Sequence, residues 1–145
     1  MTATEAQQTT TLPVEHLFTV TVETDPAPTF IPNAPQGTRL VVRVTGGTFE
    51  GARLNGTVLP GGGDWVTMRA NGTMKLDVRI TLQTDDGAAI LMTYSGIGTD
   101  GGARLRTAPL FETGDERYAW LNDVQAVSHG NVIEGGVRYD VYALG

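Results

Sequence analysis

Hydrophobic and polar residues alternate with a period of two along much of the chain. Residues 17–22 read Leu-Phe-Thr-Val-Thr-Val, and residues 75–82 alternate a second apolar set with Lys, Asp, Arg and Thr. Because successive side chains of a strand point to opposite faces of a sheet, this period predicts half-buried strands. Nineteen glycines interrupt such segments at short intervals. The pattern is typical of an all-β sandwich or barrel built from many short strands.

The pattern predicts strands at residues 17–23, 38–45, 52–59, 64–70, 73–83, 88–96, 103–107, 117–127 and 136–143. No segment has the helical period that a protein with parallel strands and crossover helices needs. Four prolines lie between Pro26 and Pro35. Proline fixes φ and lacks an N–H donor, which excludes a helix or a central strand, so we expect a long surface loop there.

The length of 145 residues indicates one domain. Residues 1–12 contain no Lys or Arg and no long apolar stretch, which argues against a secretory signal and predicts a disordered leader before a single domain at residues 13–145. No apolar run approaches the roughly 20 residues that cross a bilayer, so no membrane partner is expected. The absence of cysteine excludes disulfides and thiolate chemistry and fits a cytoplasmic location.

Charge and motif content narrow the function classes further. The formal net charge is −6 and Lys75 is the sole lysine, which argues against nucleic-acid binding because that needs clustered cations. The two histidines, His16 and His129, are isolated, so no metal site is expected. No phosphate-binding motif follows the glycine-rich stretch 61–63. We therefore expect a protein without a cofactor that binds a small molecule.

Two turn signals predict a row of polar side chains. Asn71-Gly72 and Asp86-Gly87 are typical of two-residue hairpin loops. Such loops would place Asp64 opposite Arg79, and Arg79 opposite Tyr94. Directly opposed residues lie close enough for a carboxylate, a guanidinium and a phenol to interact. Asp77 and Met92, each two residues from a member of the row, would share its face.

The other face of these strands is apolar in the expected register, and it carries Trp65, Val78, Ile80, Leu82 and Leu91. Two interpretations follow. Either the polar row faces solvent on the outside of a sandwich, or it lines the cavity of a closed barrel whose apolar face is covered by another layer.

Several segments together resemble a known family. They are Gly61-Gly62-Gly63-Asp64-Trp65, Thr84-Asp85-Asp86-Gly87, Phe111-Glu112-Thr113, Tyr118-Ala119-Trp120-Leu121-Asn122 and Val137-Arg138-Tyr139-Asp140-Val141-Tyr142. In this order and spacing they resemble a bacterial family catalogued as a domain of unknown function, number thirty-two thirty-seven. The resemblance implies a single antiparallel β-barrel of about eight to nine strands with little or no helix, often assembled as a homo-oligomer. It also favours the cavity interpretation of the polar row.

The resemblance suggests further pocket residues, namely Trp65, Glu112, Trp120 and Asn122. With the polar row they predict a cofactor-independent enzyme of the lyase, isomerase, cyclase or hydrolase-like kind that acts on a small cyclic or aromatic metabolite. Asp64 would be the base or anion, Arg79 its positioner or a clamp for a substrate carboxylate, and Tyr94 the acid. The alternatives are a carrier or sensor that only binds its ligand, as lipocalins do, and a structural oligomer.

Overall fold

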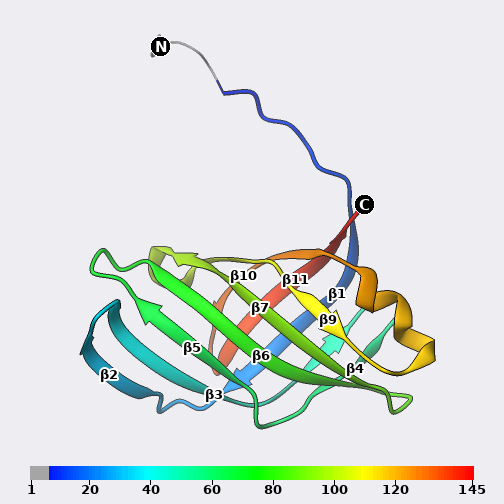
Figure 1. Ribbon diagram of the computed structural model, residues 1–145, viewed down its shortest axis with the longest axis horizontal. Helices are drawn as coiled ribbons and strands as arrows, with labels where there is room; N and C mark the ends of the chain where they lie inside the picture. Colours follow the sequence, from blue (N-terminus) through cyan, green and yellow to red (C-terminus); the bar gives the residue numbers. More distant parts are fainter. Residues whose placement is uncertain (1–6) are drawn as a thin grey trace.

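The computed structural model describes residues 7–145, which fold into a twisted antiparallel β-barrel (Figure 1). The strands of this described part are β1 (Val14–Thr24), β2 (Thr29–Ala34), β3 (Gly37–Glu50), β4 (Asn55–Val58), β5 (Gly63–Met68), β6 (Met74–Thr84), β7 (Ala89–Thr99), β8 (Arg104–Thr107), β9 (Leu110–Glu112), β10 (Ala126–Ile133) and β11 (Gly136–Leu144). Two short 3-10 segments, η1 (Asp100–Gly102) and η2 (Glu116–Asp123), complete it.

Eight of these strands close on themselves within the described residues. They pair in the order β6-β5-β3-β1-β11-β10-β8-β7, and the pairing of β6 with β7 completes the ring. The strands β2, β4 and β9 add to this barrel, on β3, on β3 and β6, and on β7 respectively. The expected all-β barrel with little helix is confirmed. Closure leaves no free edge along the barrel itself, which is the usual solution for an antiparallel sheet of this size.

The proline-rich stretch and residues 117–127 differ most from the expected elements, and the short strand β9 was not expected either. The proline-rich stretch contains the strand β2, which pairs only with β3 and exposes nearly all of its residues. Pro32 is tolerated because a strand at the edge does not need every N–H for pairing. Residues 117–127 do not form one strand, since the segment is η2 up to Asp123 and β10 begins only at Ala126. The side chain of Asp115 accepts from the Arg117 N–H and so starts η2.

Both hairpins around β6 have three-residue loops rather than the expected two. The Arg69 N–H donates to the Thr73 carbonyl and the Gly72 N–H to the Arg69 carbonyl. The Asp86-Gly87 turn has the same arrangement between Thr84 and Ala88. The glycines take φ values of 87° and 93°, as the last position of this turn type requires.

The longer loops move the register of each hairpin by one residue. Asp64 pairs with Val78 instead of Arg79, and Val78 pairs with Tyr94. The two errors cancel across β6, so Asp64 and Tyr94 still share one row and one face. Arg79 moves to the opposite face, because side chains alternate with a period of two.

Large side chains fill one half of the barrel interior. Phe18 lies between Phe49 and Phe111, with ring centroids 5.5 and 6.0 Å apart. Leu82 and Met92 are 0% and 1% exposed in the same cluster. This half is therefore a solid hydrophobic core.

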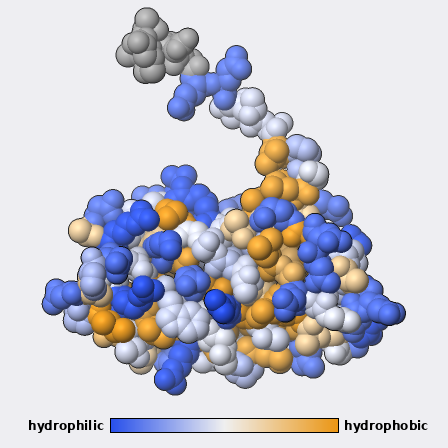
Figure 2. All heavy atoms as spheres, in the orientation of Figure 1, coloured by the Kyte–Doolittle hydropathy of each residue, from blue (hydrophilic) through white to orange (hydrophobic). Residues whose placement is uncertain are grey.

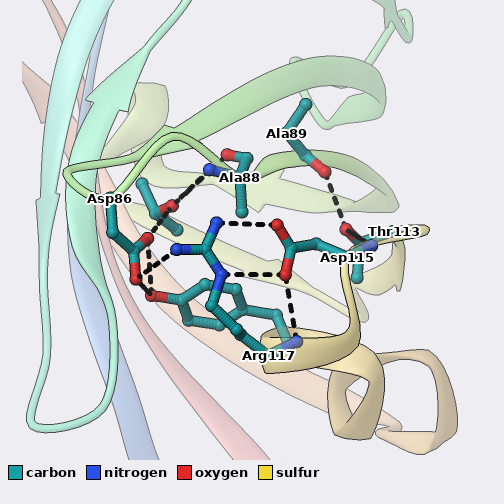
Figure 3. A network of polar contacts seen from close by, with 8 residues as sticks. Asp86, Ala88, Ala89, Thr113, Asp115 and Arg117 are labelled. Atoms are coloured by element: carbon teal, nitrogen blue, oxygen red, sulfur yellow. Dashed lines mark hydrogen bonds and ion pairs between the residues drawn. The ribbon is translucent and has the colours of Figure 1, made fainter.

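A polar network ties η2 to the turn between β6 and β7 at the filled end (Figure 3). The Tyr118 hydroxyl donates to the Asp86 carboxylate at 2.9 Å, and Thr84 also donates to Asp86. Arg117 pairs with both Asp86 and Asp115, at 3.3 and 2.8 Å. Since η2 packs over the barrel end, these contacts hold η2 in place there.

Two further observations concern the described residues. The helical segments among residues 7–145 are too short or too polar to cross a membrane. Over the same range, His, Asp and Glu side chains form no group of three or more that could hold a metal ion. Half of the expected leader, residues 1–6, lies outside the described part of the chain, and residues 7–13 run away from the barrel without regular structure.

Candidate functional site

The other half of the barrel interior is hollow. It holds a cavity of about 190 Å³ whose wall is made mainly of valine, leucine and methionine side chains. The polar side chains in the wall are Thr24, Asp64, Tyr94 and Tyr139. The hollow arises because the inward positions of this half carry valines and glycines where the filled half carries phenylalanines.

The cavity has a floor of two tyrosines. Tyr94 from β7 and Tyr139 from β11 are 5% and 3% exposed, and their rings meet edge to face with centroids 5.4 Å apart. The next inward residues beyond them, Met92 and Val141, belong to the solid core. Asp64, which is only partly buried, lines the wall in the same row as Tyr94, since both pair with Val78.

The open end has an apolar rim. Met74, at the start of β6, and Leu40 of β3 line it and are partly exposed, while Val132 is 51% exposed. Phe30 of β2 pairs with Leu40, and so its side chain lies on the cavity side of the sheet, with 61% of it exposed. Figure 2 shows hydrophobic side chains at the surface in the region of β2.

The regular pairing of β5 with β6 is interrupted next to Asp64. The β5–β6 pairs run from Asp64 with Val78 to Thr67 with Lys75 without a paired residue between them. In this gap the Asp77 N–H donates to the Asp64 carboxylate at 3.1 Å. Burial raises the pKa of Asp64 from 3.8 to about 7, although the hydrogen bond from Asp77 opposes this rise.

The two tyrosines remain neutral over the physiological range. Burial raises the pKa of Tyr94 well above its ordinary value, and the nearby Tyr139 and Asp64 add to the effect. Burial also raises the pKa of Tyr139, again with help from Asp64. Both phenols are therefore hydrogen-bond donors at pH 7, and the carboxyl beside them exchanges a proton near that pH. Such a set can donate and recover a proton and can hold a ligand oxygen.

The structure keeps two of the three residues of the expected polar row together and moves the third away. Asp64 and Tyr94 line the cavity, whereas Arg79 lies exposed on the outer face and pairs with Thr93. Asp77 is also exposed on the outside. Arg79 therefore cannot clamp a carboxylate inside the cavity, because the one-residue register shift turned its side chain outward.

The remaining expected pocket residues lie outside the cavity as well. Trp65 is 39% exposed on the outer face, next to Asp64 in sequence but on the opposite side of the strand. Met92 is in the solid core, and Glu112 is exposed on β9. Trp120 stacks under the Arg53 guanidinium at 3.5 Å. The Asn122 side chain bonds the Thr113 backbone N–H and carbonyl, at 2.8 and 3.0 Å, which fixes the loop before η2.

Sequence reasoning missed Tyr139 as a site residue. A signal was present, since Tyr139 stands between Val137 and Val141 in an alternating strand. A tyrosine at an inward position flanked by valines needs a partner for its hydroxyl, which points to a polar spot inside the barrel.

Comparison with known proteins agrees with the fold. The solved structure of a β-barrel-like protein from Acinetobacter baumannii AYE matches with a TM-score of 0.86 and 28% identity, over 97% of this chain and 100% of that chain. An enzyme from Penicillium herquei matches with a TM-score of 0.78 and 28% identity, over 97% and 100% of the two chains.

Several relatives match by sequence, and so does a family model. A UPF0311 protein from Rhodopseudomonas palustris strain TIE-1 is 31% identical over 78% of this chain and 84% of its own length. The hydroalkoxylation enzyme phnH from Penicillium herquei is 36% identical over 78% of this chain and 70% of its own length. The model described as "Protein of unknown function (DUF3237)" matches residues 12–144. The chain therefore belongs to the DUF3237 family of β-barrel proteins.

Proposed function

We propose that this protein is a cofactor-independent enzyme that catalyses proton transfer on a small cyclic or aromatic molecule held in the barrel cavity. The observation that carries the proposal is a carboxyl group with a pKa near 7, Asp64, beside two neutral phenols in an otherwise apolar cavity. Perturbed acids of this kind are typical of catalytic sites, because a pKa near the working pH suits a group that must both give and take a proton.

The relative named as a hydroalkoxylation enzyme supports a particular reaction type. Hydroalkoxylation adds the O–H of an alcohol or phenol across a carbon–carbon double bond, and it needs neither an oxidant nor a reductant. The protonated Asp64 carboxyl would donate its proton to one alkene carbon. The substrate oxygen would then form a C–O bond to the other carbon, and the hydroxyl proton would return to Asp64.

Tyr94 and Tyr139 would serve as positioning donors in this reaction. Their hydroxyls at the cavity floor would hydrogen-bond the substrate oxygen and hold it near the alkene, which lowers the entropic cost of ring closure. The apolar wall would exclude water, the competing nucleophile. A carrier that binds the same ligand without reaction is the second candidate, and the largely apolar lining of the cavity favours it.

Conversion of 2-allylphenol to its cyclic ether tests the proposal, with products followed by chromatography. We expect turnover by the wild-type protein and a loss of about 10²- to 10⁴-fold in Asp64→Asn, the range typical for removal of a general acid. Asp77→Asn is the matched control, since it removes an exposed carboxylate from the neighbouring strand. The rate should also fall as pH rises above 7, because Asp64 then loses its proton.

Two results would count against catalysis. Saturable binding of the allylphenol without turnover would identify a carrier. Equal rates for Asp64→Asn and Asp77→Asn would remove Asp64 from the reaction.

A further inference from the structure

The cavity combines a polar floor with a wall and rim that carry no positive charge. Among residues 7–145, no Lys, Arg or His side chain lines the cavity. The guanidinium that the sequence predicted for this site, that of Arg79, is exposed on the outer face. A bound anion would therefore be buried near the Asp64 carboxyl without a counter-charge, which is strongly unfavourable.

The polar groups are also unevenly placed along the cavity. Tyr94 and Tyr139 form the floor, and Asp64 lines the wall in the row of Tyr94, whereas the rim is formed by Met74, Leu40 and other apolar residues apart from Thr24. Met74 lies four residues before Val78 on β6, the strand that passes Asp64 and Tyr94. Four residues of strand span about 13 Å. Apart from the Thr24 hydroxyl, a ligand thus meets hydrogen-bonding side chains only at its inner end.

The rim extends beyond the barrel on one side. Phe30 continues the inward face of β3 past Leu40, and most of its side chain is exposed. It offers apolar surface to any part of a ligand that projects from the cavity. No residue of β2 lines the cavity itself, so this strand would contact only a part of a ligand that projects past the rim.

From this distribution we infer that the ligand is an uncharged, mainly hydrocarbon molecule with a hydroxyl or carbonyl oxygen at one end, that it enters oxygen first, and that its hydrocarbon end lies against Phe30 and Met74 at the rim. This inference rests on the cavity of the proposed function and names the class of substrate that it takes. It excludes aromatic acids as substrates, which the register expected from the sequence would have favoured.

Binding of three saturated probes tests the inference: 4-propylphenol, 4-propylbenzoate and propylbenzene, measured by calorimetry at pH 8. None contains an alkene, so the measurement reports binding without turnover. We expect the phenol to bind at least tenfold more tightly than the benzoate, because the anion has no cationic partner. The phenol should also bind about five- to tenfold more tightly than propylbenzene, which corresponds to roughly one net hydrogen bond.

Variants test the orientation. Tyr94→Phe and Tyr139→Phe should remove the advantage of the phenol over propylbenzene, whereas Tyr142→Phe, which changes an outward tyrosine of β11, should not. Phe30→Ala should weaken 4-hexylphenol severalfold and leave 4-propylphenol nearly unchanged. Benzoate affinity equal to that of the phenol would overturn the charge assignment, and an equal effect of Phe30→Ala on both alkylphenols would overturn the orientation.

The outcomes separate this inference from the proposed function. If the phenols bind as expected but allylphenol is not converted, the class of ligand stands and catalysis fails. If the benzoate is preferred, the class of ligand fails whatever the result of the turnover assay.

Discussion

Leu82 and Leu76 are inward-facing residues of the same strand, six positions apart, yet they lie in different halves of the barrel. Leu82 pairs with Ile90 and Val58, which are both buried. Leu76 pairs with Gly96 and lines the cavity. The strand pattern is the same in both halves, so the size of the neighbouring inward residues decides whether the interior is solid or hollow.

Acidic residues differ between the two halves in the same way. At the filled end Asp115 and Asp86 lie outside the barrel in a network with Arg117 (Figure 3). The hydrogen bond from the Arg117 side chain lowers the pKa of Asp115 to about 2. In the hollow half, burial without a cation raises the pKa of Asp64 to about 7. The first arrangement stabilises the fold, and the second keeps a proton available.

The largest expected effect is a difference in stability between a variant in the solid core and a variant in the cavity wall. Leu82→Ala should lower the free energy of unfolding by about 2–5 kcal/mol, because it opens a void among tightly packed side chains. Leu76→Ala should cost clearly less, since it enlarges a cavity that already exists. Chemical denaturation of both variants checks this, and equal losses would mean that the cavity collapses or is filled in solution.

The second effect concerns the partly buried carboxyl of Asp64, and its size depends on pH. The pKa of Asp64 is higher in the folded state, near 7, than the ordinary 3.8, so the folded protein binds this proton more tightly than the unfolded chain does. The free energy of unfolding of the wild-type protein, relative to that of Asp64→Asn, should therefore decrease as pH rises from about 4 to 7 and stay constant above pH 7. The full pKa difference corresponds to about 4 kcal/mol, which is an upper limit.

Denaturation of wild type and Asp64→Asn at pH 4 and pH 8 measures this difference. Asp64→Asn should gain stability over wild type only at the higher pH. Asp77→Asn should show a much smaller gain, because the Asp77 charge adds less than burial does to the rise in the pKa of Asp64. A gain of the same size there would remove burial as the main cause.

A smaller effect is expected from the network at the filled end. Tyr118→Phe removes the hydroxyl that donates to Asp86 at 2.9 Å, which should cost about 1 kcal/mol of stability. Because the change is at the opposite end of the barrel from the cavity, affinity for 4-propylphenol should not change. Calorimetry and thermal melting of one sample give both values, and a loss of affinity would show that the two ends are coupled.

The smallest effect is expected from Arg79→Ala. The side chain is exposed on the outer face, so the melting temperature and the affinity for 4-propylphenol should both stay close to those of the wild type. A loss of affinity in this variant would place Arg79 at the cavity after all and would favour the two-residue turns.

The alternation of residues was enough to predict most strands and the barrel class, because a period of two depends only on local geometry. The register was not predictable from Asn71-Gly72 and Asp86-Gly87, since the same dipeptides fit loops of two or three residues. Asp64 and Tyr94 were placed together correctly only because the two shifts cancel. Arg79 lies on β6, the strand between them, so the one-residue register shift moved its side chain to the opposite face.

Predictions for other residues were wrong because their positions depend on tertiary structure. The prolines around β2 argue against a central strand but not against an edge strand, and only the pairing with β3 distinguishes an edge strand from a loop. Trp120 and Asn122 alternate like strand residues. The Asp115 side chain caps the start of η2, and the hydrogen bond between Thr113 and Asn122 fixes the preceding loop, so this segment forms η2 instead. Whether an inward position faces solid core or cavity depends on partners across the barrel, as Met92 and Tyr139 illustrate.

The hydrogen bond from the Asp77 N–H to the Asp64 carboxylate provides a spectroscopic probe of the site. An amide proton that donates to a carboxylate senses whether that carboxylate is charged, so its chemical shift follows the titration of the acid. A pH series of amide spectra would therefore read the protonation state of Asp64 directly from the backbone of the neighbouring strand. The same resonance would register a ligand that takes or gives this proton, without a label inside the cavity.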